Sequence, residues 1–105
     1  MTQQGSQLGF TTFEGQTIAC FNVGGELRLC LPHILNRVLG HVPVEAVYQA
    51  CGELQINISN CSQSQLQALN NAGIFEVDVT ARRVGLISES DAERLCTRYL
   101  LLLNY

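Results

Sequence analysis

VGGELRLCLP, residues 23–32, decides the fold, because this stretch holds a tight turn, a strand and the start of a helix. Alternating side chains on both sides of Gly24 and Gly25 predict antiparallel strands over residues 17–23 and 26–31. Adjacent glycines readily adopt the positive φ angles of a two-residue turn. The sequence therefore predicts a hairpin in this region.

The register of that hairpin sorts its side chains onto two faces. A two-residue turn pairs Val23 with Glu26 and therefore Cys20 with Leu29. One face is apolar enough to be the core side and comprises Ile18, Cys20, Leu27, Leu29 and Leu31. The other face mixes apolar and charged groups, namely Ala19, Phe21, Val23, Glu26, Arg28 and Cys30. This second face is either covered by another layer or open to a partner.

Periodicity and helix-terminating residues predict the remaining elements. The expected helices cover residues 32–40, 43–52, 62–73 and 88–103, and the expected strands cover residues 54–58, 75–80 and 84–87. Ser62 with Gln65 predicts a capping box, Gly73 ends the same helix, and Ser88 caps the last one. The helix after Pro43 is expected to bury Val44, Val47, Tyr48 and Cys51. The fold class is α+β, a compact mixed α/β domain in the order β-β-α-α-β-α-β-β-α.

Length and composition indicate one globular domain. The chain has 105 residues, of which 47% are hydrophobic, so a core can form without disulfides or metals. Residues 1–12 are expected to be a flexible lead-in and residues 13–105 the folded domain. The N-terminus lacks the basic and apolar regions of a signal peptide, and we expect neither secretion nor membrane insertion. Five cysteines without a C-x-x-C pair indicate reduced, partly buried thiols.

No enzyme, metal or cofactor pattern accompanies the fold. His33 and His41 flank a short helix without a cysteine or carboxylate at ligand or triad spacing, so both are expected to be surface or capping histidines. Glu76 and Asp78 share one face of an expected strand, and an exposed polar face explains them. We expect no catalytic activity, no cofactor and no metal site.

Three motifs in order carry a family resemblance: GGELRLCLPHILN (24–36), NCSQSQLQALNNAGI (60–74) and GLISESDAERLC (85–96). Over residues 13–100 they resemble the homology domain shared by Ski, Sno and Dachshund proteins, closest to the Ski/Sno branch. Ile58 and Val84 stand where that branch usually has cysteines, which argues against a thiol-based or metal role, and His33 stands where glutamine is common.

The resemblance implies a nuclear domain of mixed α/β architecture, partly similar to a winged helix, within transcriptional co-regulators. For the Ski/Sno branch it implies corepressor assembly, with partners such as nuclear receptor corepressor and Smad proteins. For the Dachshund branch it implies DNA binding.

A protein-interaction module is the leading functional prediction. The expected partner-binding surface is the outer face of the hairpin with the polar side of the next helix, comprising Phe21, Val23, Gly24, Gly25, Glu26, Arg28, His33, Asn36 and Arg37. Its apolar members would be buried by the partner and its polar members would orient it. The domain is expected to be a monomer in the nucleus, and possible presence in the cytoplasm is left open.

Two alternatives remain open. A winged-helix-like DNA-binding module would use Gln63, Gln67, Arg82, Arg83, Arg94 and Arg98. The chain has no lysine and a net charge of −3, and this balance disfavours nucleic acid, since phosphate neutralisation supplies most nonspecific affinity. A self-association domain is the other alternative, suggested by Leu100 and Leu101, which fall off the apolar stripe of the last helix.

Overall fold

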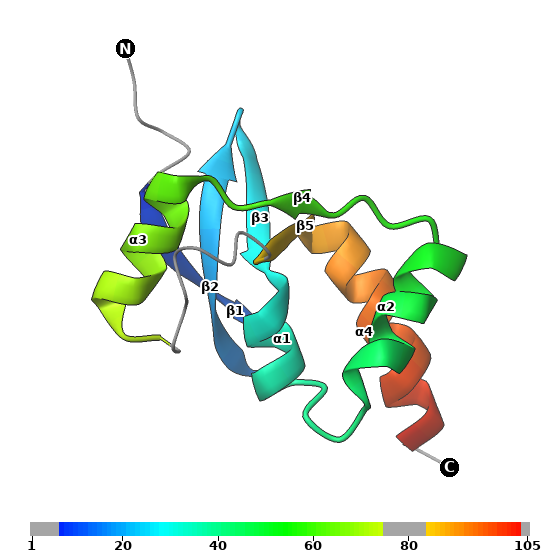
Figure 1. Cartoon of the computed structure of the whole chain (residues 1–105). Helices are drawn as coiled ribbons and strands as arrows, with labels where there is room; N and C mark the ends of the chain where they lie inside the picture. Colours follow the sequence, from blue (N-terminus) through cyan, green and yellow to red (C-terminus); the bar gives the residue numbers. More distant parts are fainter. Residues whose placement is uncertain (1–6, 75–83, 104–105) are drawn as a thin grey trace.

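A computed structural model of the chain describes the backbone of residues 7–74 and 84–103 and the side chains of residues 7–74 and 84–99. Its elements are β1 (Leu8–Phe13), β2 (Gln16–Val23), β3 (Glu26–Cys30), α1 (Leu31–Arg37), α2 (Val44–Glu53), β4 (Ser59–Asn60), α3 (Gln63–Ala72), β5 (Gly85–Ser88) and α4 (Glu89–Leu103). The strands form one antiparallel sheet in the order β1-β2-β3-β5-β4 (Figure 1). The mixed α+β class is confirmed, and the expected strand over residues 75–80 lies outside the described residues.

The β2–β3 hairpin has the predicted register. Val23 pairs with Glu26 and Cys20 pairs with Leu29. Gly24 and Gly25 have φ angles of 61° and 84°, the left-handed conformations that such a turn requires. The Asn22 side chain supports the turn, because its Oδ1 accepts a hydrogen bond from the Gly25 N–H at 3.0 Å.

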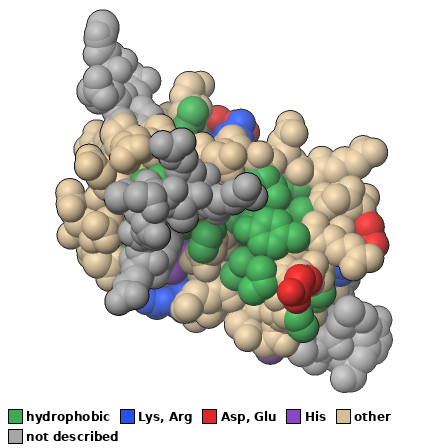
Figure 2. Space-filling view, viewed as in Figure 1, with side chains coloured by type: hydrophobic (Ala, Val, Ile, Leu, Met, Phe, Trp, Pro, Cys, Tyr) green, Lys and Arg blue, Asp and Glu red, His purple; other side chains and the backbone are tan. Residues whose placement is uncertain are grey.

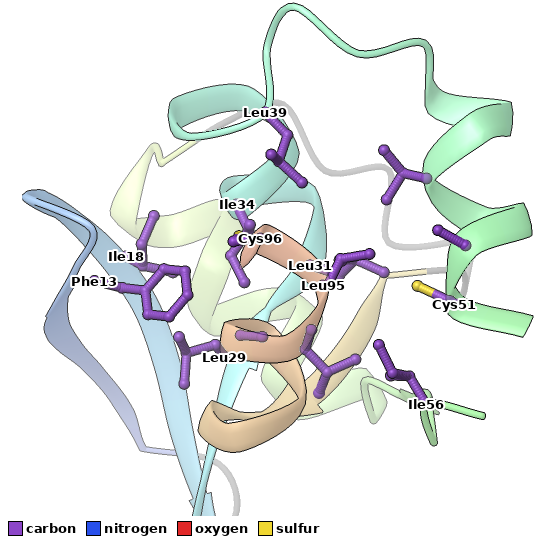
Figure 3. Close-up of a cluster of buried hydrophobic side chains, with 14 of the residues drawn as sticks. Phe13, Ile18, Leu29, Leu31, Ile34, Leu39, Cys51, Ile56, Leu95 and Cys96 are labelled. Carbon is purple, nitrogen blue, oxygen red and sulfur yellow. The ribbon is translucent and has the colours of Figure 1, made fainter. Parts of the chain in front are cut away.

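Two hydrophobic clusters lie on opposite faces of the sheet, since neighbouring residues of a strand point to opposite sides. The larger cluster joins Ile18 and Leu29 of the sheet to α1, α2 and α4. Figure 3 shows its strand side chains facing Ile34 of α1 and Leu95 of α4. The smaller cluster joins Phe21 and other sheet residues to α3. Figure 1 shows the resulting layers, with α3 on one side of the sheet and α2 and α4 on the other.

The expectation of a flexible lead-in is wrong for residues 8–12. They form most of β1, which pairs with β2 from Leu8 opposite Phe21 to Phe13 opposite Gln16. A second tight turn at Glu14 and Gly15 joins the two strands, with φ angles of 50° and 75°. Glutamate is an uncommon residue in this conformation, which is why the turn is hard to see in the sequence.

The strand expected over residues 54–58 is also wrong. This segment instead ends α2. The Leu54 N–H donates to the Ala50 carbonyl, and the Ile56 N–H donates to the Cys51 carbonyl. Gln55 between them is left-handed, with φ 57°. Alternation of apolar residues over this segment reflects Ile56 packing into the larger cluster, and the strand β4 is limited to Ser59–Asn60.

The predicted helix caps are confirmed. Ser62 and Gln65 form a reciprocal capping box at the start of α3, and Gly73 ends that helix in the left-handed conformation. At the start of α4, the Ser88 Oγ accepts a hydrogen bond from the Asp91 N–H at 3.2 Å.

Candidate functional site

The hairpin face that was expected to meet a partner is covered by α3. Phe21 is only 1% exposed and packs in the smaller cluster with Leu66 and Leu69 of α3. The expectation that Phe21 offers an open apolar surface is therefore wrong, because a second layer covers that face. Val23, two residues further along β2, is 38% exposed.

His33 is likewise not a surface residue, since it is 3% exposed. Its Nδ1 accepts a hydrogen bond from the backbone N–H of Ala19 at 2.9 Å. In the hairpin ladder this N–H would face the carbonyl of Cys30, but Cys30 is the N-cap of α1 and directs its carbonyl into the helix. The imidazole of His33 therefore replaces a strand carbonyl. Burial, with the nearby Arg37 charge, lowers the pKa of His33 and keeps it neutral.

The remaining predicted partner residues do not form one surface. Exposed residues Val23 to Glu26 form the tip of the hairpin at one end of β3, whereas Asn36 and Arg37 lie on α1, beyond the other end (Figure 1). Between them, the Arg28 guanidinium forms a salt bridge with Glu26 at 2.9 Å and donates to the Ser59 Oγ at 3.2 Å. Arg28 thus ties β3 to β4.

The residues expected for DNA binding are also dispersed. Gln63 and Gln67 are exposed on α3, on the opposite side of the sheet from α4. On α4, Arg94 forms a salt bridge with Asp91 at 2.9 Å, and Arg98 forms one with Glu53 of α2 at 2.6 Å. Arg82 and Arg83 lie outside the described residues. The described part of the chain brings these groups into no single basic stripe.

An apolar groove between α1 and α2 is a candidate site. Its volume is about 470 Å³, within the usual range for ligand pockets. It is lined mainly by Pro32, Leu35, Asn36, Leu39, Val42 and Val44. The lining follows from the local sequence, because α1 and α2 lie on either side of the connection over residues 38–43. Figure 2 shows hydrophobic side chains gathered over this face of the molecule.

Val44 and Tyr48 extend this apolar surface along α2. They are 53% and 41% exposed, although the sequence predicted both to be buried. Val47 and Cys51 of the same stripe are buried, so α2 turns only part of its apolar face inward. Sequence periodicity identified the stripe but not its division, since that depends on where α4 packs. We define the α1–α2 groove as Pro32, Leu35, Asn36, Leu39, Val42, Val44 and Tyr48.

The chemistry of the α1–α2 groove suits an apolar polypeptide segment. Apart from the Tyr48 phenol, Asn36 supplies the one polar side chain of the groove, and the exposed side chains of Arg37, His41 and Glu45 lie at neighbouring positions in the sequence. Partial burial raises the pKa of Tyr48, so its phenol stays protonated at neutral pH and can donate a hydrogen bond. The groove can therefore bury side chains and fix their orientation.

The cysteines form part of the core. All five are free and buried. Burial raises the pKa of Cys30 and Cys96 to about 12 and that of Cys61 to about 11, so these thiols are protonated at neutral pH. The described residues hold no cluster of three or more metal-ligating side chains. Among the same residues, no helix has the length and apolar content to cross a bilayer.

Comparison with known proteins points to one family. A family model described as the SKI/SNO/DAC Dachshund homology domain matches residues 1–101. The chain is 48% identical to the Ski oncogene of Gallus gallus over 90 residues and 43% identical to the Ski-like protein of Homo sapiens over 95 residues. It is 33% identical to the SKI family transcriptional corepressor 1 of Homo sapiens over 95 residues.

These matches cover most of the chain and a small part of each relative. They span 86%, 90% and 90% of the chain, in the same order. They span only 12%, 14% and 10% of the relatives. The activities and partners of the full-length relatives are therefore only proposals for this chain.

Proposed function

The chain belongs to the SKI/SNO/DAC Dachshund homology domain family, a family of transcriptional co-regulators, and from this premise we propose that it is a protein-interaction module that helps to assemble a corepressor complex in the nucleus. The proposed partners are transcriptional corepressors or Smad-type proteins, and the proposed docking site is the α1–α2 groove. We propose no enzymatic role.

The exposed apolar pair Val44 and Tyr48, beside a preformed groove, is the observation that carries this proposal. They are two of the four exposed large hydrophobic side chains of the described residues, and they lie one helical turn apart on α2. Contiguous apolar surface next to a concave site is typical of protein interfaces. An amphipathic helix of the partner would place its apolar face in the groove and its polar face toward solvent.

Asn36 remains part of the proposed site, and Arg37 is the next residue of α1, outside the lining of the groove. Asn36 lines the groove and can orient the partner through hydrogen bonds to its backbone. Arg37 is exposed on the same helix and can pair with an acidic residue of the partner. His33 supports the site from within, because it links α1 to β2, whereas Phe21 lies under α3 in the smaller cluster, on the other face of the sheet.

Binding of purified nuclear receptor corepressor and Smad proteins, measured by calorimetric titration at physiological salt, tests this proposal. We expect Val44→Glu and Tyr48→Ala each to weaken binding about 10- to 100-fold, because truncating a central apolar contact typically costs about 1–3 kcal/mol. Both side chains are exposed, so the melting temperature should change little.

Phe10→Ala is the matched control, since Phe10 is 54% exposed but lies on β1, away from the groove. It should leave the affinity unchanged. Equal weakening by all three variants, or none by Val44→Glu, would remove the groove as the docking site. Titration with random duplex DNA belongs in the same series, and strong, salt-sensitive association would favour the DNA-binding alternative.

A further inference from the structure

β1 is an edge strand without the usual protection. Its sequence, LGFTTF, contains no charged residue and no proline. Natural proteins commonly place lysine, proline or a bulge on such edges, because unpaired backbone N–H and C=O groups attract other strands. No strand of the described residues pairs with the outer side of β1. This edge therefore offers a template for strand addition.

The register shows which groups the edge presents. The tight turn pairs Phe13 with Gln16, and hydrogen-bonded pairs alternate along an antiparallel ladder. Phe13, Thr11 and Gly9 accordingly direct their backbone groups to β2. The outward backbone groups are those of the alternate residues, Leu8, Phe10 and Thr12.

We propose that β1 pairs with β1 of a second copy of this chain, antiparallel about a twofold axis at Phe10. In that register Phe10 faces Phe10 of the second copy, and Leu8 of each copy faces Thr12 of the other. Each outward N–H then meets an outward carbonyl, so the register leaves none of the three residues unpaired. The two sheets join into one continuous sheet.

Self-complementarity favours a second copy as the occupant. The Phe10 side chain, 54% exposed, would lie directly beside its symmetry mate, and aromatic cross-strand pairs stabilise antiparallel sheets. The chain carries a net charge of −3, but β1 carries none, so pairing brings no like charges together at the edge. A twofold contact of this kind also closes, because each copy uses its single β1 edge.

Sedimentation velocity from about 10 μM to about 1 mM, a range in which weak dimers dissociate, tests the proposal. The unmodified domain should shift from monomer to dimer across this series. Thr12→Pro removes an outward N–H without breaking the ladder to β2, and Phe10→Glu places like charges opposite each other. We expect each to weaken dimerisation at least about tenfold, with an unchanged circular dichroism spectrum.

Val44→Glu is the matched control, since Val44 is 53% exposed on α2 and should leave dimerisation intact. Hydrogen exchange gives a second readout: the amides of Leu8, Phe10 and Thr12 should gain protection as the concentration rises, whereas those of Gly9, Thr11 and Phe13 should be protected throughout. A monomer at about 1 mM, a dimer that survives Thr12→Pro, or outward amides that never gain protection would each overturn the proposal. The first of these outcomes would leave the edge to an extended strand of another protein.

Discussion

The side chain of His33 accepts a hydrogen bond that a strand carbonyl would accept in a regular β-ladder. The Ala19 N–H lies where the hairpin ladder ends, and the imidazole Nδ1 accepts its hydrogen bond at 2.9 Å. An imidazole can accept at Nδ1 only while that nitrogen is unprotonated. The junction of β2, β3 and α1 therefore depends on a neutral histidine.

This dependence predicts a loss of stability in mild acid. Burial lowers the folded-state pKa of His33, so the unfolded chain binds a proton first as the pH falls below about 6.5. The stabilisation is complete above that pH and is lost as the pH falls toward the lowered folded-state pKa. In His33→Asn, whose Oδ1 takes the place of Nδ1, we expect this loss to disappear. In the unmodified domain, the loss between pH 7.5 and pH 5.5 should amount to roughly 2–6 °C in melting temperature.

Melting curves followed by circular dichroism at several pH values measure the effect. His41→Asn is the control, because His41 is exposed, and it should retain the pH dependence of the unmodified domain. Parallel pH profiles of His33→Asn and the unmodified domain would show that His33 is not responsible.

Local rules explain why some residues were predictable and others not. Gly24, Gly25 and Ser62 have sequence neighbours that fix their role, and each occupies the predicted conformation or cap. His33 could not be placed in this way, because its partner is 14 residues away and becomes available only when Cys30 turns its carbonyl into α1. Distance in sequence separates the two cases.

At the scale of elements, the same contrast appears between α3 and α2. The ends of α3 carry their own signals, a capping box and a left-handed glycine, and both were predicted. The apolar stripe of α2 is a helix signal as well, but it does not say which part of it faces the core. Tertiary packing decides that Val47 is buried and Val44 is exposed, and this division creates the candidate site.

The capping box of α3 yields a second prediction. Ser62→Ala removes the hydrogen bond that the Gln65 N–H donates to the Ser62 Oγ at 3.2 Å. We expect a loss of about 1 kcal/mol in the free energy of unfolding, measured by urea denaturation, because the N–H is left without its cap. Ser62→Thr should recover most of that loss.

Gln67→Ala serves as the control on the same helix, since Gln67 is exposed and alanine is a good helix former. It should leave the stability unchanged or slightly higher. If Ser62→Ala were as stable as Gln67→Ala, the capping box would contribute nothing to the domain.

At the scale of the whole molecule, one sheet separates two hydrophobic clusters. β2 contributes Ile18 to the larger cluster and Ala19 and Phe21 to the smaller one, so the same strand holds both layers together. The sequence showed that the second hairpin face could be covered, but the covering helix α3 lies some 40 residues later. Whether that face is covered or open depends on the sheet topology, and local sequence patterns do not determine the topology.

The shared sheet predicts that both layers unfold together. Phe21→Leu reduces packing only in the smaller cluster and should lower the free energy of unfolding by about 1 kcal/mol. The described tyrosines, Tyr48 and Tyr99, lie on α2 and α4, on the other side of the sheet, and the chain has no tryptophan. Tyrosine fluorescence therefore reports on the layer opposite the substitution.

We expect the fluorescence midpoint in urea to shift by the same amount as the midpoint from far-ultraviolet circular dichroism, because the strands transmit the loss across the sheet. A shift seen by circular dichroism alone would mean that the α3 layer unfolds separately while the layer that carries the α1–α2 groove stays folded.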